Sequence, residues 1–527
     1  MALKSAGRLQ LIFLAIVNSV SMAHFGYDQV PHHSPASLPV ANSKHPQGIF
    51  SGALISADFI KLFPETSDPN ISGITSSCFS LGAFFGCIAA FLLGDRLGRR
   101  RTVWAGLFTN VIGAVLQIAA YHLPQMIVGR LINGFGMGLT SSTCPVFMAE
   151  TSPSHIRGKL VVLGSLCNTT GFCLASWINY ALFNDNGPLQ WRFPLAFQLV
   201  FPLIVTLFLP FTIESPRWLL LRGRNYDAQR ALCQLRGKGQ NLEDKDLNDD
   251  MKSIQQAIQD ERADLSTLRE TLLFRDPNRN FRRLLLSCGT MVMQQFSGVN
   301  ALSYYLPTLL IQSVGVSSEN ARLLTGANAT VYLGAAFLCL LLVDLVGRRK
   351  LMMYGSVAMG SCYLIAAVTL KEASLHPEQK TTLGSVTVAM FFLYYFFYGT
   401  SFAKVAWVYN AEVNSLGWRT RGAAAATATN WLGGFTTVQF TKVGVNNLGW
   451  GFYLLFSCFC YSYLPVVYLL YPETSRRTLE DMTEIFKGNS RLLVFNNHIL
   501  TQRKRPQVFI DAERRRIDGR TSGTGNV

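Results

Sequence analysis

The sequence predicts an all-α membrane protein with twelve transmembrane helices in two six-helix halves. Three observations lead to this fold class. Of the 527 residues, 49% are hydrophobic and only 15% are charged, with a mean hydropathy of +0.23, whereas soluble domains usually carry about a quarter charged residues. Apolar runs of about 20 residues, the length that crosses a bilayer as a helix, recur along the chain. Two charge motifs also recur, once in each half.

The apolar runs define the predicted spans and the domains. A polar segment of both charge signs, residues 214–283, separates the first six runs from the last six. We therefore divide the chain into an N-terminal half, a cytoplasmic central loop, a C-terminal half and a cytoplasmic tail, at 1–213, 214–283, 284–471 and 472–527. The spans lie near 9–28, 72–94, 102–121, 125–148, 160–183, 193–213, 284–312, 323–345, 350–370, 385–411, 422–443 and 450–471.

Lysine and arginine set the orientation of the predicted helices. The loops after spans two and four, the central loop and the tail are rich in these residues. All four lie on one face when twelve spans are drawn, so the positive-inside rule makes both termini cytoplasmic. The loop after span one then faces outside, where Asn70-Ile71-Ser72 is a predicted N-glycosylation site.

Two charge motifs lie at matching places in the two halves. The motif that begins at Asp95 follows span two, and the one that begins at Asp344 follows span eight; Glu150 and Glu412 each precede an arginine by seven residues. Such duplication is typical of transporters. A partly desolvated network at these cytoplasmic helix ends can bias one conformation, whereas topology anchoring by the arginines is the simpler alternative. The predicted network comprises Asp95, Arg96, Arg99, Glu150, Arg157, Glu214, Arg217, Asp344, Arg348, Glu412 and Arg419.

The composition argues against several other classes. The net charge of +16 falls in loops and the tail, so no basic stripe on a soluble fold indicates nucleic-acid binding. The 11 cysteines form no C-x-x-C pair, and we predict neither a disulfide framework nor a metal site. No nucleophile–base pair or phosphate loop indicates an enzyme, and no cofactor is predicted.

Six motifs appear in order along the chain. They are Gly94-Asp95-Arg96-Leu97-Gly98-Arg99-Arg100, Gly129-Arg130-Leu131-Ile132-Asn133-Gly134, Pro145-Val146-Phe147-Met148-Ala149-Glu150 running to Arg157-Gly158, Glu214-Ser215-Pro216-Arg217-Trp218-Leu219, Gln294-Gln295-Phe296-Ser297-Gly298-Val299-Asn300, and Pro472-Glu473-Thr474-Ser475. With these motifs, residues 8–486 resemble the sugar porter family of the major facilitator superfamily, especially its fungal sugar/H+ transporters. The resemblance implies the major facilitator fold and alternating access around a central site.

The resemblance also implies where the solute binds. Intramembrane amides usually form helix–helix hydrogen bonds, which is the alternative to a binding role. The residues that match sugar-binding positions of the family are Gln294, Gln295, Asn300 and Asn430, with Trp407 as the aromatic against which the ring packs. Tyr304 and Tyr305 resemble the outer gate.

Asp28 and Arg130 are ionisable residues inside predicted spans, where a charge is costly and usually functional. In proton-coupled relatives the matching aspartate takes up a proton and releases the matching arginine, which favours proton symport. Some facilitators also have this aspartate, so facilitated diffusion, with a structural ion pair, stays open.

Three positions depart from the family pattern within the site. Ser165 and Tyr332 stand where the family has a glutamine and an asparagine, and Lys404 stands where it has a proline. A buried lysine favours an anion or becomes neutral. We therefore hypothesise that these three residues contact a solute with a carboxylate, such as a sugar acid or a quinate-like polyol. The alternative is that Lys404 extends to the membrane surface or pairs with another side chain.

Residues 30–47 interrupt the pattern that follows Asp28. Without them Gly26-Tyr27-Asp28-Gln29 would join Gly48-Ile49-Phe50-Ser51-Gly52, as in the family. Valine codons begin with GT and a glutamine codon can end in AG, the letters of intron boundaries, so we predict a retained intron in the recorded sequence. The alternative is a real extracellular insertion whose three histidines suggest metal binding.

These observations predict a secondary active transporter that imports a sugar or sugar-like polyhydroxylated solute together with protons. We expect a monomer that crosses the lipid bilayer of the plasma membrane many times. A facilitative carrier, an exporter of a specialised metabolite and a transporter-like nutrient sensor are the alternatives. Such sensors usually have long cytoplasmic tails, whereas only about 55 residues follow Pro472.

Overall fold

The computed structural model confirms the helical fold class, since its described residues contain helices and no strand. The insert at 30–47, most of the central loop and the end of the tail lie outside those residues, so the predictions made for them stay predictions. The structure describes residues 2–28, 57–152, 157–182, 187–236, 279–311, 315–415, 418–475, 479–488, 493–503 and 505–511, parts of 251–259, Asp276 and Arg477.

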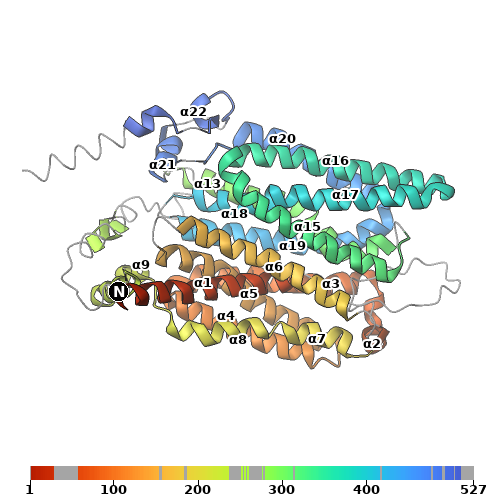
Figure 1. Cartoon of the computed structure of the whole chain (residues 1–527), viewed down its shortest axis with the longest axis horizontal. Coiled ribbons are helices and arrows are strands. Elements are labelled where there is room, and N and C mark those ends of the chain that lie inside the picture. Colours follow the sequence, from red (N-terminus) through yellow and green to blue (C-terminus); the bar gives the residue numbers. More distant parts are fainter. Residues whose placement is uncertain are drawn as a thin grey trace, which may run out of the picture.

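The first half forms the lower layer of Figure 1. Each of its six predicted spans is occupied by a helix or a pair of helices. In order these are α1 (Ala2–Asp28), α3 (Pro69–Leu97), α4 (Arg99–Ile118), α5 (Leu123–Thr151), α6 (Arg157–Ala181), and α7 (Leu189–Phe197) continued by α8 (Val200–Phe208). A short helix, α2 (Ala57–Leu62), precedes α3. α5 packs against α3 and α4, and α1 packs against α6 and α8.

The second half forms the upper layer (Figure 1). Its spans are α13 (Asn280–Phe296) with α14 (Val299–Leu309), α15 (Ser318–Val346), α16 (Arg348–Leu375), α17 (Lys380–Thr400) with α18 (Phe402–Val413), α19 (Arg419–Leu448) and α20 (Gly451–Leu470). The two halves meet where α19 packs against α3 and α15 packs against α6. These four helices therefore lie at the boundary between the halves.

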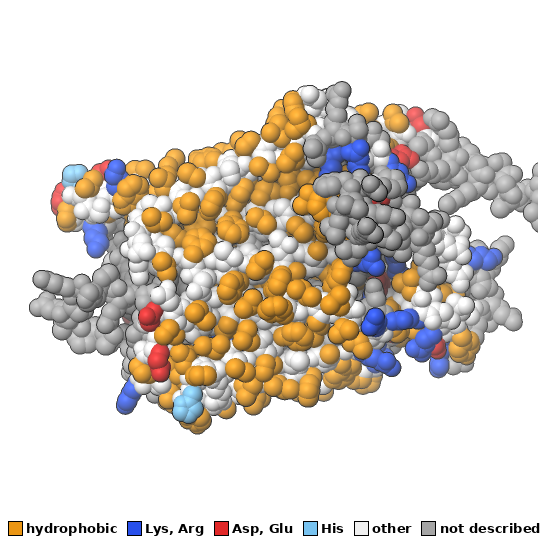
Figure 2. All heavy atoms as spheres, turned by 180° about the vertical axis from the view of Figure 1, so that it is seen from behind, with side chains coloured by type: hydrophobic (Ala, Val, Ile, Leu, Met, Phe, Trp, Pro, Cys, Tyr) orange, Lys and Arg blue, Asp and Glu red, His pale blue; other side chains and the backbone are white. Residues whose placement is uncertain are grey.

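The apolar surface of the bundle is typical of a protein in lipid. Phe108, Leu203 and Leu341 are each at least 60% exposed, and hydrophobic side chains cover the middle of the molecule in Figure 2. Within the described residues, seven stretches are long and apolar enough to cross a membrane by length and composition alone. α4, α5, α6, α13 with α14, and α19 are not among them. Length and hydropathy in the described residues therefore support seven of the twelve predicted spans, and the count of twelve stays a prediction.

One end of the bundle carries the short helices outside the spans. α9 (Pro216–Leu221), α10 (Asn225–Arg236), α21 (Leu479–Gly488) and α22 (His498–Thr501) lie at the end where the chain begins. Figure 1 shows α9 beside the N-terminus, and α21 and α22 at the same end of the bundle next to the second half. Lysine and arginine gather at this end in Figure 2. This charge asymmetry agrees with the orientation predicted from the loops.

Candidate functional site

Span seven is broken between two of the predicted amides. α13 ends at Phe296 and α14 begins at Val299, and Gly298 between them has a φ of 91°, which favours glycine. Across this break, Nδ2 of Asn300 donates to Oε1 of Gln295 at 2.6 Å. Discontinuous helices of this kind bring polar groups into the middle of a transporter.

Gln294 connects the break in span seven with the break in span ten. Its Nε2 donates to the carbonyl oxygens of Phe402 and Ala403, each 3.3 Å away at the start of α18. Its Oε1 accepts from Nδ2 of Asn430 on α19 at 2.7 Å. The structure thus brings the predicted amides together, and the bonds among them also hold helices together, as the alternative interpretation expects.

Trp407 lies beside the amides with aromatic rings from both halves. It is half-buried on α18 and packs on the cluster that contains Met291, whose sulfur accepts from Asn430 Nδ2 at 3.6 Å. Its ring is 6.3 Å from Phe25 of α1 at 74°, and Phe25 is 4.9 Å from Trp431. The sequence analysis did not single out Phe25, because one aromatic residue in an apolar span carries no signal.

Lys404 reaches from the second half to the first. It is 5% exposed, and its Nζ donates to the carbonyl oxygen of Ser165 at 2.6 Å and to Oγ1 of Thr169 at 2.7 Å, both on α6. The side chain therefore does not extend to the membrane surface. Ser165 contributes its backbone rather than its hydroxyl, a contact that a sequence pattern cannot reveal.

Tyr332 belongs to a group of aromatic rings rather than to the amides. It is buried on α15, with its ring 5.8 Å from Phe172 of α6 at 87°. Its ring also lies 5.6 Å from Tyr395 and 5.8 Å from Tyr398 on α17. Where the resemblance leads one to expect an amide, this wall therefore offers an aromatic surface.

Asp28 has a histidine neighbour that the sequence analysis missed. Nε2 of His24, one turn earlier on α1, lies 3.2 Å from Oδ2 of Asp28, and both side chains are 4% exposed. The His24 ring stacks on Phe201 of α8 at 5.5 Å. Arg130 on α5 donates to the carbonyl oxygen of Ser76 at 3.2 Å and forms no direct ion pair with Asp28 among the described residues. A second ionisable residue four positions before Asp28 in an apolar span was the available signal.

In the first half, two glutamates hold the start of α4. The Arg99 guanidinium donates to both carboxylate oxygens of Glu150, at 3.0 and 2.9 Å. Glu214 accepts from the backbone N–H groups of Arg99 and Arg100 at 3.1 and 3.2 Å, where a carboxylate stabilises a helix N-terminus. Burial raises the pKa of Glu214, while these N–H donors and Arg99 act in the opposite direction.

The second half repeats the arrangement at the start of α16. Arg348 donates to both oxygens of Glu412 at 3.1 and 2.8 Å and to Oδ1 of Asp344 at 2.7 Å. Glu473 accepts from the backbone N–H groups of Arg348 and Arg349 at 3.0 and 3.2 Å. Oγ1 of Thr474 donates to Glu412 at 2.6 Å. Glu473 was missing from the predicted network, although its correspondence to Glu214 after the last span of each half was visible in the sequence.

Other predicted residues are placed less fully. Arg96 is exposed and Arg217 is half-buried. Asn70 is exposed at the start of α3, which Asp68 caps by accepting from the Asn70 N–H, so the predicted glycosylation site is accessible. The side chains that lie outside the described residues, including both gate residues, are those of Asp95, Arg157, Tyr304, Tyr305 and Arg419.

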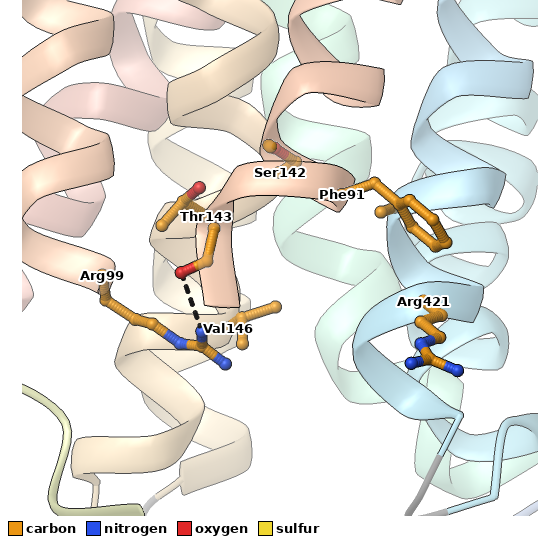
Figure 3. Close-up of a pocket in the computed structure, with 9 residues that line it drawn as sticks. Phe91, Arg99, Ser142, Thr143, Val146 and Arg421 are labelled. Carbon is orange, nitrogen blue, oxygen red and sulfur yellow. Dashed lines mark hydrogen bonds between the residues drawn. The ribbon is translucent and has the colours of Figure 1, made fainter. Parts of the chain in front are cut away.

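A pocket opens between the halves near the start of α4. In Figure 3, Arg99 of the first half and Arg421 of the second lie on opposite sides of it. Nη1 of Arg99 also donates to the carbonyl oxygen of Gly94 at 3.4 Å. The pocket therefore presents two cations at the boundary between the halves. Its lining residues are Ala90, Phe91, Gly94, Arg99, Ser142, Thr143, Val146, Arg421 and Ala424.

The sequence matches a family of transporters over nearly its full length. The profile of the family described as "Sugar (and other) transporter" matches residues 14–486. "MFS-type transporter oryC" of Aspergillus oryzae is 38% identical over 96% of this chain and 91% of the relative. "Sugar transporter STL1" of Saccharomyces cerevisiae is 31% identical, covering 91% and 82%. A "Probable quinate permease" of Aspergillus fumigatus is 32% identical, covering 79% of each chain.

A solved structure has the same fold. The proton:xylose symporter XylE, bound to 6-bromo-6-deoxy-D-glucose, superposes with a TM-score of 0.72 over 90% of this chain and 99% of the other. The two sequences are 21% identical, so the likeness concerns the fold alone.

Proposed function

The chain belongs to the sugar (and other) transporter family, and from this premise we propose that it imports a polyhydroxylated, sugar-like solute together with protons. The observation that carries the proposal is the amide group at the breaks of spans seven and ten, where Gln294 bonds both to the start of α18 and to Asn430. The solute would bind there, and the halves would expose it to each side of the membrane in turn.

The amides suit a ligand with many hydroxyls. Each amide offers donors and an acceptor, as each hydroxyl does, so the Gln294–Asn430 and Gln295–Asn300 bonds can be exchanged for bonds to a sugar. Trp407 is half-buried and adds an aromatic ring against which a sugar ring can pack. Sugar transporter STL1 and XylE with its bound bromo-deoxyglucose support a sugar-like substrate.

We place the proton site at Asp28 and His24. Their atoms are 3.2 Å apart and both side chains are almost fully buried, where a carboxylate is costly unless it is paired or protonated. Arg130 on α5 and Tyr27, whose hydroxyl donates to the Pro194 carbonyl oxygen at 3.0 Å, are the other ionisable groups nearby. A proton on the pair would cancel the negative charge and weaken the attraction of Arg130 to α1.

The proposed setting is the plasma membrane, with both termini in the cytoplasm and the chain as a monomer. The charge asymmetry supports this orientation, because lysine and arginine gather at the end that carries the N-terminus (Figure 2). The division into two halves, a central loop and a tail stays as predicted from the sequence.

Uptake tests the proposal. Yeast cells without their own hexose carriers would express the full chain, and separately a chain without residues 30–47, and receive labelled glucose, fructose, xylose, galacturonate and quinate. We expect uptake of at least one solute, reduced about fivefold or more in Gln294→Ala, because an unpaired buried amide partner costs about 1–3 kcal/mol. Gln379→Ala, at an exposed glutamine between α16 and α17, is the control. No uptake by protein at the cell surface would reject import in favour of an exporter or a sensor.

Proton coupling has its own test. Uptake of the same solute is measured at pH 5 and pH 7, with and without a protonophore. We expect the protonophore to abolish accumulation by the wild type, and Asp28→Asn to leave only uptake that does not respond to it. His24→Gln should shift the pH dependence, because it removes the ionisable neighbour of Asp28. If the protonophore does not change uptake by the wild type, the result would indicate facilitated diffusion.

A further inference from the structure

Lys404 is buried, and the partners of its amino group in the described part of the chain are neutral. Its ammonium is held by the Ser165 carbonyl oxygen and the Thr169 hydroxyl, and in the described part of the chain no carboxylate lies within ion-pair distance of it. Two of its three N–H donors are used by these bonds. Within the described residues, the protonated group would therefore have no charged partner and one donor without a bond.

Such a charge is expensive in a protein interior. Removing an ammonium from water costs several kcal/mol, and neutral acceptors recover only part of this. The usual solutions are a carboxylate partner, a path to the surface or loss of the proton, and the described structure provides neither of the first two. A site with an uncompensated buried cation favours an anionic ligand, because the ligand supplies the missing charge.

One of the amides that we assign to the solute bonds the backbone directly before Lys404. Gln294 donates to the carbonyl oxygens of Phe402 and Ala403, the two residues before Lys404, and Trp407 lies about one helical turn after it. The cation, the amides and the indole are thus on or against the same short helix, α18. One solute can contact all three groups.

We propose that Lys404 is a binding subsite for a carboxylate carried by the transported solute, which is therefore a polyhydroxylated acid. This inference rests on the proposed transport function and gives its substrate a chemical class. The carboxylate would take the free donor and then replace the Ser165 and Thr169 oxygens. Because these two belong to α6 of the first half, binding would exchange a bond between the halves for a bond to the solute.

Paired solutes test the inference. Galacturonate and galactose differ in a carboxylate against a hydroxymethyl group, so their uptake ratio reports on the subsite alone. We expect the full chain to take up galacturonate faster than galactose. Lys404→Met should reduce galacturonate uptake at least about tenfold and leave galactose uptake unchanged or higher, because loss of one partner of a buried charge pair usually costs more than a factor of ten. Lys404→Arg, which keeps the charge, should retain the preference for the acid.

Controls separate a specific effect from misfolding. Lys371→Met removes a lysine whose Nζ lies 5.2 Å from the Trp450 ring at the far end of α16, and should change neither uptake. For a variant that fails to reach the surface, the melting temperature of purified wild type with galacturonate or galactose replaces uptake, and only the acid should raise it.

The outcomes also separate this inference from the proposed function. Uptake of galactose with no uptake of galacturonate, or equal uptake of both in wild type and Lys404→Met, overturns the carboxylate subsite and leaves sugar transport standing. Uptake of neither solute, with no shift in melting temperature by either, overturns the carboxylate subsite, and the proposed transport function falls with it only if glucose, fructose, xylose and quinate are not taken up either.

Discussion

The two halves hold their cytoplasmic helix ends with the same parts but use one residue differently. In each half a glutamate after the last span, Glu214 or Glu473, caps the helix that follows the second span. An arginine at the start of that helix forms an ion pair with a second glutamate, Glu150 or Glu412. In both halves the residue after the capping glutamate carries a side-chain hydroxyl. Ser215 accepts from the N–H of Trp218 and caps α9, whereas Thr474 donates to Glu412.

This difference follows from what comes next in the chain. α9 begins at Pro216, directly after Ser215, and needs a cap, whereas α21 begins only at Leu479. Thr474 is therefore free to bond Glu412. The two arginine–glutamate ion pairs also differ in exposure: the side chains of Arg99 and Glu150 are 5% and 10% exposed, and those of Arg348 and Glu412 are 8% and 28% exposed. The two halves thus share the same capping and ion-pair interactions. The segment after each capping glutamate determines how exposed the ion pair is and whether its glutamate has a second donor.

The largest expected effect comes from removing the arginines. Arg99→Met leaves Glu150 buried without a donor among the described residues, so we expect a loss of about 3–5 kcal/mol in the free energy of unfolding. Arg348→Met should cost less, because Glu412 keeps Thr474 and some contact with water. Thermal unfolding of the purified protein measures both. Arg224→Met, at an exposed pair with Asp227, should cost less than about 1 kcal/mol. A greater loss in Arg348→Met would mean that exposure does not govern these pairs.

The second effect isolates the hydroxyl of Thr474. Thr474→Val alone should cost about 1 kcal/mol, the value of one hydrogen bond. In the Arg348→Met background the same substitution should cost more, because the Thr474 hydroxyl is then the remaining donor to Glu412 among the described residues. A double-mutant cycle on melting temperatures measures this coupling.

A control for that cycle is Thr436→Val, whose hydroxyl donates only to Leu432 of its own helix. Additive losses in the Thr474 cycle would show that the hydroxyl does not support Glu412.

The sequence predicted the positions of the helices better than the contacts between side chains. Hydropathy and the motifs placed the spans, and the family and fold that they imply were confirmed. The amides on both sides of Gly298 were predicted, but the helix break was not. An isolated glycine in a helical sequence does not indicate that its φ is positive. One of the two partners of Lys404 is a backbone carbonyl, which every residue has. His24 and Glu473 were readable, by spacing from Asp28 and by correspondence to Glu214, and were missed.

A smaller effect tests the first-half hydroxyl. Ser215→Ala should cost about 1 kcal/mol, the value of a lost N-cap, because its Oγ accepts from the Trp218 N–H at 3.2 Å. The loss should add to that of Arg99→Met within about 0.5 kcal/mol, because the Arg99 guanidinium and the Ser215 hydroxyl have different hydrogen-bond partners, although the backbone N–H groups of both residues bond Glu214. Strong coupling between these two variants, measured by the same melting experiment, would mean that the two hydroxyls act alike after all.

The smallest expected effect is a pH dependence that the first half owes to Glu214. Burial raises the pKa of this carboxyl group above its ordinary value. Between the two values the folded state binds more protons than the unfolded state, so the free energy of unfolding falls as the pH rises through that window. Glu214→Gln removes the group. The melting temperature of the wild type, compared with that of the variant, should therefore decline as the pH is raised from about 4.5.

Ser215→Ala is the matched control for this pH series, because it keeps the Glu214 carboxyl group and should decline as the wild type does. The opposite slope, with the wild type gaining on Glu214→Gln as the pH rises, would mean that the backbone N–H donors of α4 and the charge of Arg99 outweigh burial. The capping glutamate of the first half would then stabilise the protein as an ion, and its protonation would loosen the start of α4.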